Sequence, residues 1–248
     1  GTIAAAQISR AKPDGYTLGF VPTSHAVSAA MYKSLPFNAV DSFTIVGQGN
    51  ESPFVLVTYG DSPLHTLTDL IKTARERSTP LLCGVPGQGT PQHLLIEYLS
   101  RLANIKVQVV PFHGGNQALT ELLGKRLDFL IDPPIALVSQ IKSGALRAIA
   151  VTGPKHFAAL PDVGTVAEAG FPGFSVTSWM GIIAPPHLPN DITARVNREL
   201  NGLLAEPAVV ERLRALGSEP KGGTPDDFKK QIAADVARWN KVIDDAKI

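Results

Sequence analysis

The sequence predicts an α/β fold with a mostly parallel sheet that carries helices on both faces. Between residues 66 and 152, apolar strand-like segments alternate with segments of helical periodicity, and this alternation is typical of parallel sheets. Two extended runs, Pro53–Thr58 and Ser178–Ala184, flank the alternating block. We interpret these runs as crossovers between two lobes.

The residues before this block predict a helix, a strand and a second helix. Residues 3–11 have a helical pattern that ends at the turn signal Pro13-Asp14-Gly15. A strand is expected over residues 16–21, followed by Pro22-Thr23-Ser24-His25 and a helix that reaches Tyr32. Hydroxyl groups at the end of a strand suit a ligand in an α/β cleft. They suit helix capping as well, which is the more frequent role.

The rest of the chain divides into segments bounded by glycine, proline and capping residues. Thr165-Val166-Ala167-Glu168 has the pattern of a capping box, which typically begins a helix. The expected helices are residues 66–77, 117–124, 135–142, 191–205, 208–215 and 225–246, and the further expected strands are residues 43–47, 107–111, 127–131, 146–152 and 174–184.

The stretch Leu81–Leu99 combines a strand, a glycine loop and a helix start. Gly84, Gly87 and Gly89 interrupt the apolar run, and Thr90-Pro91 supplies an N-cap followed by proline at the first helical position. Free N–H groups at the positive end of a helix dipole bind anions. The same spacing fits a plain βα turn with a capped helix, and both interpretations stay open here. The loop is not a P-loop, because no lysine follows Gly89.

A second turn of this kind precedes the next expected helix. His113-Gly114-Gly115-Asn116 presents a glycine pair and a capping residue at a helix start. Asp132 ends the following strand, at a position where a side chain can meet a ligand. Structural bonding to loop N–H groups is an equally good role for this carboxylate. No acid or base lies near it in the sequence, so we predict no catalytic residue.

Composition and spacing argue against several other functions. The 248 residues carry a net charge of +1 without a basic stripe, which argues against a nucleic-acid partner. No run of about 18 apolar residues occurs, so the chain is not expected to be membrane-embedded. The six histidines lack metal-ligand spacing and Cys83 is the single cysteine, so we predict neither a metal site nor an intramolecular disulfide.

Several short motifs follow one another in order along the chain. They are Pro13-Asp14-Gly15-Tyr16-Thr17-Leu18, Leu35-Pro36-Phe37 with Asp41 and Phe43, Gly87-Gln88-Gly89-Thr90 with His93-Leu94, Pro111-Phe112-His113-Gly114-Gly115, Leu146–Thr152, Leu160-Pro161-Asp162-Val163 with Thr165–Gly170, Trp179-Met180-Gly181, and Thr224-Pro225 with Phe228 and Trp239. This series resembles the substrate-binding proteins of tripartite tricarboxylate transporters, also called Bug-type receptors. The similarity extends over essentially the whole chain.

The resemblance implies a two-lobed, periplasmic-binding-protein-like type II fold with two mixed or mostly parallel sheets flanked by helices. Lobe 1 is expected to comprise residues 1–57 and 180–248, and lobe 2 residues 58–179. The lobes are expected to close around a small mono- or dicarboxylate and to deliver it to membrane transporter subunits, without a metal or a cofactor. The resemblance also implies an exported, periplasmic protein whose signal peptide is absent from this chain.

The family places the loop Gly87–Thr90 against the ligand, which favours the anion-binding interpretation. Two alternatives stay open. One is an α/β enzyme that uses Asp132 and a histidine at the same cleft, and the other is a sensory binding protein that signals to a membrane kinase. The predicted ligand-binding residues are Thr23, Ser24, His25, Gly87, Gln88, Gly89, Thr90, His93, Gly114 and Asp132.

The first residues lead to one more expectation. Family members carry an earlier βα unit that faces the same carboxylate, and Gly1-Thr2-Ile3 resembles the helix that follows that unit. We therefore expect residues 1–248 alone to bind carboxylates weakly and to self-associate through an exposed strand edge.

Overall fold

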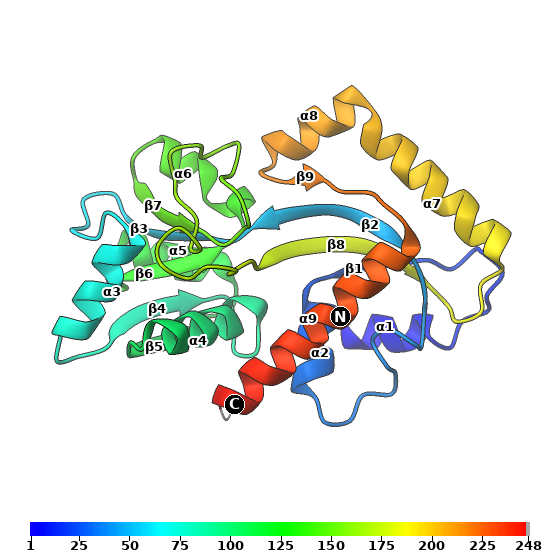
Figure 1. The fold of residues 1–248 in the computed structure, drawn as a ribbon, viewed down its shortest axis with the longest axis horizontal. Coiled ribbons are helices and arrows are strands. Elements are labelled where there is room, and N and C mark those ends of the chain that lie inside the picture. Colours follow the sequence, from blue (N-terminus) through cyan, green and yellow to red (C-terminus); the bar gives the residue numbers. More distant parts are fainter. Residues whose placement is uncertain (247–248) are drawn as a thin grey trace. The chain divides into compact units, whose positions relative to one another are not determined.

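The computed structural model describes residues 1–246 and divides the chain into two compact units. Unit 1 comprises Gly1–Glu51 and Trp179–Ile248, and unit 2 comprises Ser52–Ser178. The sequence-based division placed the two boundaries after residues 57 and 179. Each unit has its own sheet and its own helices (Figure 1). Within residues 1–246, no helix combines the length and the apolar composition that a membrane span requires.

Unit 1 contains a four-stranded sheet in the order β1-β8-β2-β9. Strand β1 pairs antiparallel with β8, and β2 pairs antiparallel with β9. Helices α2 and α9 pack side by side (Figure 1). The elements are α1 (Thr2–Ile8), β1 (Gly19–Pro22), α2 (Ser24–Met31), β2 (Thr44–Pro53), β8 (Thr177–Ala184), α7 (Asn190–Ala205), α8 (Pro207–Ala215), β9 (Glu219–Pro220) and α9 (Pro225–Ala246).

Trp179 anchors α9 in the core of unit 1. Its side chain is fully buried and contacts Phe228 edge to face, with 5.1 Å between the ring centroids. The indole N–H donates to Asp235 Oδ2 at 2.6 Å, and the Arg238 guanidinium donates to the other carboxylate oxygen at 2.9 Å. A buried carboxylate is costly unless it is hydrogen-bonded. Arg238 satisfies it from within α9, and the Trp179 indole joins α9 to β8.

Unit 2 contains a five-stranded sheet in the order β5-β4-β6-β3-β7. Strand β4 runs parallel to β5 and β6, as the alternating pattern predicts, whereas β3 runs antiparallel to β6 and β7. The sheet is therefore mixed. The elements are β3 (Val55–Tyr59), α3 (Leu67–Glu76), β4 (Leu81–Val85), α4 (Pro91–Ala103), β5 (Val107–Pro111), α5 (Gly115–Leu123), β6 (Phe129–Asp132), the 3₁₀ turn η1 (Pro134–Ala136), α6 (Val138–Lys142) and β7 (Leu146–Val151).

The predicted crossover run Pro53–Thr58 belongs to two different strands. Pro53 ends β2, and Val55 begins β3, which lies between β6 and β7 inside the sheet of unit 2. Strand β3 is completely buried at Val55, Leu56 and Val57, which explains its continuous apolar run. Two other elements are shorter than predicted. The first helix, expected to reach residue 11, ends at Ile8, and the strand expected from residue 16 begins only at Gly19.

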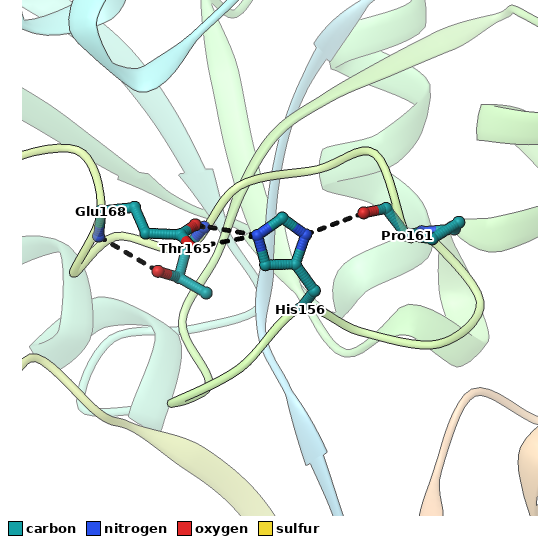
Figure 2. Close-up of polar contacts among 4 residues, drawn as sticks. All are labelled: His156, Pro161, Thr165 and Glu168. Carbon is teal, nitrogen blue, oxygen red and sulfur yellow. Dashed lines mark hydrogen bonds and ion pairs between the residues drawn. The ribbon is translucent and has the colours of Figure 1, made fainter.

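The capping box at Thr165 forms, but the residues after it make a turn instead of a helix. The Glu168 N–H donates to Thr165 Oγ1 at 3.1 Å, and the Thr165 N–H donates to Glu168 Oε2 at 2.8 Å. Figure 2 shows the His156 ring between Glu168 and Pro161, with Nε2 at 3.0 Å from Glu168 Oε2 and Nδ1 at 2.8 Å from the Pro161 carbonyl oxygen. The Pro161 carbonyl and the Glu168 carboxylate raise the pKa of His156. These contacts tie the loop together at the surface.

Candidate functional site

The parallel strands of unit 2 bring three chain segments to one edge of the sheet. Strands β4, β5 and β6 point the same way, so their carboxyl ends share the edge where α/β proteins bind ligands. The loop Pro86–Thr90 joins β4 to α4, the loop Phe112–Gly114 joins β5 to α5, and β6 ends at Asp132. One backbone bond connects the first two loops, from the Gly114 N–H to the Pro86 carbonyl oxygen at 3.2 Å.

The start of α4 is braced by its own side chains. Thr90 is the N-cap residue, and its Oγ1 accepts the His93 N–H at 3.3 Å and donates to the Gly87 carbonyl oxygen at 2.8 Å. The Gly89 N–H donates to His93 Nδ1 at 3.0 Å. The capping interpretation is therefore confirmed for the Thr90 hydroxyl. Both the hydroxyl and the Gly89 N–H are used inside the loop.

His93 holds the glycine loop from the first turn of α4. Its side chain is buried, and burial lowers its pKa, while the Glu97 carboxylate acts in the opposite direction. Because Nδ1 accepts the Gly89 N–H, the ring is the neutral imidazole with its hydrogen on Nε2. Nε2 lies 3.9 Å from Glu97 Oε1. His93 therefore shapes the predicted binding loop by hydrogen bonding within unit 2.

The start of α5, by comparison, is bare, in the sense that no side chain caps its first N–H groups. Gly114, with φ of +104°, is the N-cap residue and provides no side-chain capping bond. Within the described part of unit 2, the N–H groups of Gly115, Asn116 and Gln117 have no acceptor. A helix of nine residues places the positive end of its dipole here. These three donors are available to an anion.

Asp132 lies next to this bare helix start. The Gln92 side-chain amide donates to Asp132 Oδ1 at 2.8 Å. The other oxygen, Oδ2, faces Gly115 so closely that a Cβ atom at position 115 would stand 2.5 Å from it. Burial raises the pKa of Asp132 to about 6, while the hydrogen bond from Gln92 acts in the opposite direction. One carboxylate oxygen of Asp132 therefore lies beside Gly115, the first residue of α5.

Gln92 is a site residue that the sequence reasoning missed. It lies in the first turn of α4, two residues after the N-cap Thr90, and its partner Asp132 is 40 residues away in the sequence. The available signal was an amide side chain in the helix turn that follows a glycine loop. Nothing in the local sequence identifies the carboxylate that it contacts.

The predicted residues of unit 1 make contacts typical of a protein core. Thr23 Oγ1 makes no capping bond and accepts the Trp179 N–H at 2.7 Å. His25 is buried between Phe37 and Phe43, and its Nε2 donates to the Ala39 carbonyl oxygen at 2.9 Å. Burial lowers the pKa of His25.

Ser24 is half-buried in the first turn of α2. Together with His25 it lines a cavity of about 50 Å³, and ligand pockets typically measure about 300–1,000 Å³. Ligand binding by Thr23, Ser24 and His25 stays a prediction.

The structure brings together the predicted site residues of unit 2. They are Gly87, Gln88, Gly89, Thr90, His93, Gly114 and Asp132, and all of them lie at the loop edge of β4, β5 and β6 or in the first turn of α4. Within residues 1–246, no group of three or more His, Cys, Asp or Glu side chains is arranged to hold a metal ion.

Three solved structures share the fold of this chain. The periplasmic binding protein BugD is 28% identical, with a TM-score of 0.84 over 100% of this chain and 83% of BugD. The R. palustris protein Rpa4515, solved with adipate, is 31% identical, with a TM-score of 0.88 over 100% of this chain and 83% of that protein. MatC (Rpa3494) from Rhodopseudomonas palustris, solved with bound malate, is 28% identical, with a TM-score of 0.82 over 98% of this chain and 84% of MatC.

These likenesses confirm the predicted fold class, that of a periplasmic binding protein with two sheets flanked by helices. The family model described as "Tripartite tricarboxylate transporter family receptor" matches residues 1–248. The family that the motif series suggests is therefore confirmed over the full length of the sequence. The chain belongs to the receptor family of the tripartite tricarboxylate transporters.

Proposed function

We propose that this chain is an extracytoplasmic receptor that binds a small organic carboxylate and delivers it to a tripartite tricarboxylate-type transporter. The observation that carries the proposal is the bare start of α5 beside the braced loop of α4. Two family relatives, Rpa4515 and MatC, were solved with adipate and malate. Closure of two lobes around the ligand stays an expectation from the family resemblance.

The strength of backbone donors supports this function. A hydrogen bond to a charged group contributes about 1.5–3 kcal/mol, and a helix N-terminus adds about 0.3–1 kcal/mol for an anion. Gly115, Asn116 and Gln117 offer three such donors at the start of α5. They supply a large part of the ~8 kcal/mol that a micromolar affinity requires.

The contacts of Asp132 favour a receptor over an enzyme. General acid–base chemistry requires a group that exchanges protons within hydrogen-bond reach. The partner that the structure gives Asp132 is the amide of Gln92, and an amide side chain has no proton to exchange near neutral pH. The Nδ1 atom of the nearby His93 already accepts the Gly89 N–H.

Calorimetry with a panel of mono- and dicarboxylates tests the binding function. We expect saturable binding of at least one acid between micromolar and millimolar concentration, and NMR spectra that show the acid unchanged after prolonged incubation. Absence of binding across the panel would overturn the receptor proposal. Conversion of the acid at catalytic rates would support the enzyme alternative in its place.

The delivery step requires a separate test, because a sensory protein binds its ligand in the same way. Uptake of the labelled acid is measured in vesicles that contain the transporter's membrane subunits, with and without the receptor. We expect uptake to depend on the receptor and on its ligand. Receptor-independent uptake, together with ligand-dependent activation of a membrane kinase, would support the sensory alternative.

A further inference from the structure

We propose that Asp132 selects acids that carry a hydrogen-bond donor, either a hydroxyl or an ammonium group, next to the bound carboxylate. The inference rests on the proposed function and narrows its ligand class. The feature that carries it is the position of one free carboxylate oxygen beside free backbone donors.

The two oxygens of Asp132 have different surroundings. Oδ1 accepts the side-chain amide of Gln92 at 2.8 Å, which fixes the orientation of the carboxylate. Oδ2 points to Gly115 and has no donor within the described part of unit 2. Any side chain larger than hydrogen at position 115 would place its Cβ against Oδ2. Glycine therefore keeps the approach to this oxygen open.

An acceptor thus lies against Gly115, the residue that begins the row of three free donors at the start of α5. The N–H groups of Gly115, Asn116 and Gln117 suit a ligand carboxylate, whereas Asp132 Oδ2 suits a ligand O–H or N–H group. A 2-hydroxy acid or a 2-amino acid carries both kinds of group on adjacent carbon atoms. Such a ligand satisfies the backbone donors and the Asp132 acceptor at the same time.

The charges of the surrounding loops favour the same ligand class. Residues 86–90, 112–116 and 132–136 contain neither lysine nor arginine. Burial and the Gln92 hydrogen bond are the influences on the pKa of Asp132, with no contribution from a charged neighbour. A ligand carboxylate that faced Asp132 Oδ2 directly would meet a like charge without a cation to offset it, so we place the ligand carboxylate on the backbone donors of α5 and the donor group on Oδ2. A hydroxyl or an ammonium group would meet a hydrogen-bond acceptor.

Matched sets of acids test this proposal directly by calorimetry. Succinate, malate and aspartate share one carbon chain and differ by hydrogen, hydroxyl or ammonium at one position, and glutarate, 2-hydroxyglutarate and glutamate form a second set. In the chain length that binds best, we expect a substituted acid to bind at least tenfold more tightly than the plain dicarboxylate. The affinities of the hydroxy acid and the amino acid, compared at the same chain length, show whether Asp132 prefers a hydroxyl or an ammonium group.

Two variants connect the preference to Asp132. Asp132→Asn is expected to reduce the affinity ratio between substituted and plain acid to threefold or less, and Gln92→Leu is expected to reduce it because the carboxylate loses its orienting partner. Glu76→Gln is the control, since it removes the same charge from an exposed residue of α3 in the same unit, and it should leave the ratio unchanged.

The possible failures are distinguishable. Equal or tighter binding of the plain dicarboxylates by the unmodified protein would overturn the selection by Asp132 but leave the receptor function intact. A folded Asp132→Asn variant that keeps the full ratio would do the same. Binding of no acid in either set would overturn the proposed function itself.

Discussion

The starts of α4 and α5 lie at the same sheet edge and follow similar glycine-containing loops, yet they satisfy their backbone donors differently. At α4, Thr90 and His93 occupy the loop donors and acceptors with internal hydrogen bonds. At α5, the N-cap Gly114 has no side chain, and three N–H groups have no acceptor within the described part of unit 2. The donors of the first helix start are bonded internally, whereas those of the second are free, and it is the second that we propose for the ligand.

This difference shows that a glycine loop before a helix is not sufficient evidence for an anion site. Capping side chains compete with a ligand for the same donors. The role that we assign to the loop before α4 in the candidate site is structural. Its internal hydrogen bonds fix its conformation, and the helix that follows positions Gln92 against Asp132.

The largest effect is expected from Gly115→Ala at the bare helix start. The new Cβ would stand 2.5 Å from Asp132 Oδ2, so the Asp132 carboxylate must shift away from the position in which Gln92 orients it. Loss of one or two charge-assisted bonds, about 3 kcal/mol together, corresponds to roughly a hundredfold weaker binding in calorimetry. The melting temperature should change little, because the atoms that the new Cβ meets belong to the end of the Asp132 side chain and not to the backbone.

Gly202→Ala is the matched control for this substitution. Gly202 lies in α7 of unit 1, and a Cβ at this position meets nothing within 4 Å. It should raise the melting temperature slightly and leave the affinity unchanged. Unchanged affinity of the Gly115→Ala variant would contradict the assignment of the bare helix start to the ligand.

Asp132→Asn is expected to change the pH dependence of stability. The pKa of Asp132 rises from 3.8 in the unfolded chain to about 6 in the folded protein. The stabilisation from its proton is complete below pH 3.8 and is lost as the pH rises through 6. The variant should therefore be more stable than the parent at pH 7.5, by at most about 3 kcal/mol. Urea unfolding of both proteins at pH 4.5 and 7.5 measures the difference in their free energies of unfolding. An equal gain in stability for the variant at both pH values would show that ionisation of Asp132 is not its cause.

Thr90→Val tests the braced helix start. Loss of the N-cap hydroxyl should lower the free energy of unfolding by about 0.5–2 kcal/mol, measured by urea denaturation. Ligand affinity should fall far less than in Gly115→Ala, because the Thr90 hydroxyl is already bonded inside the loop. Thr90→Ser keeps the hydroxyl and should behave like the parent. A larger loss of affinity for Thr90→Val than for Gly115→Ala would show that the start of α4, and not that of α5, binds the ligand.

The smallest effect is expected from the protonation of His93 at acid pH. Burial lowers its folded-state pKa below the ordinary 6.5, so its contribution to stability is present above pH 6.5 and is lost as the pH falls below this value. Protonation also turns Nδ1 from an acceptor into a donor facing the Gly89 N–H. The loss of one such bond is about 0.5–1.5 kcal/mol.

His93→Asn provides the matching variant, because its side-chain oxygen can replace Nδ1 as acceptor but does not titrate. Binding measured between pH 7.5 and 5 should weaken in the parent more than in the variant. The exposed His65 supplies a control, since His65→Asn should retain the pH dependence of the parent. The same profile in the parent and in His93→Asn would contradict the role of His93.

Much of the fold could be predicted from the sequence, because periodicity and capping residues are local signals. Thr90 caps its helix as expected, and β4 pairs in parallel with β5 and β6. The insertion of β3 between β6 and β7 could not be predicted in this way. It depends on pairing between distant segments that are all equally apolar.

The candidate site was predictable only in outline. The sequence places glycine loops at two helix starts, but it does not show that Thr90 and Gly89 are bonded internally while the donors of α5 remain free. The contact between Gln92 and Asp132 joins residues 40 positions apart. Thr23 resembles a helix cap in the sequence, whereas its hydroxyl bonds to the Trp179 backbone, 156 positions away.

Amide hydrogen exchange followed by NMR tests the central claim most directly. The Gly89 and His93 amides have internal acceptors in the free protein, whereas the amides of Gly115, Asn116 and Gln117 have none within the described part of unit 2. With saturating amounts of the acid that binds best, exchange at residues 115–117 should slow by tenfold or more, with little change at Gly89 and His93. Slowing at Gly89 and His93 without slowing at residues 115–117 would contradict the account.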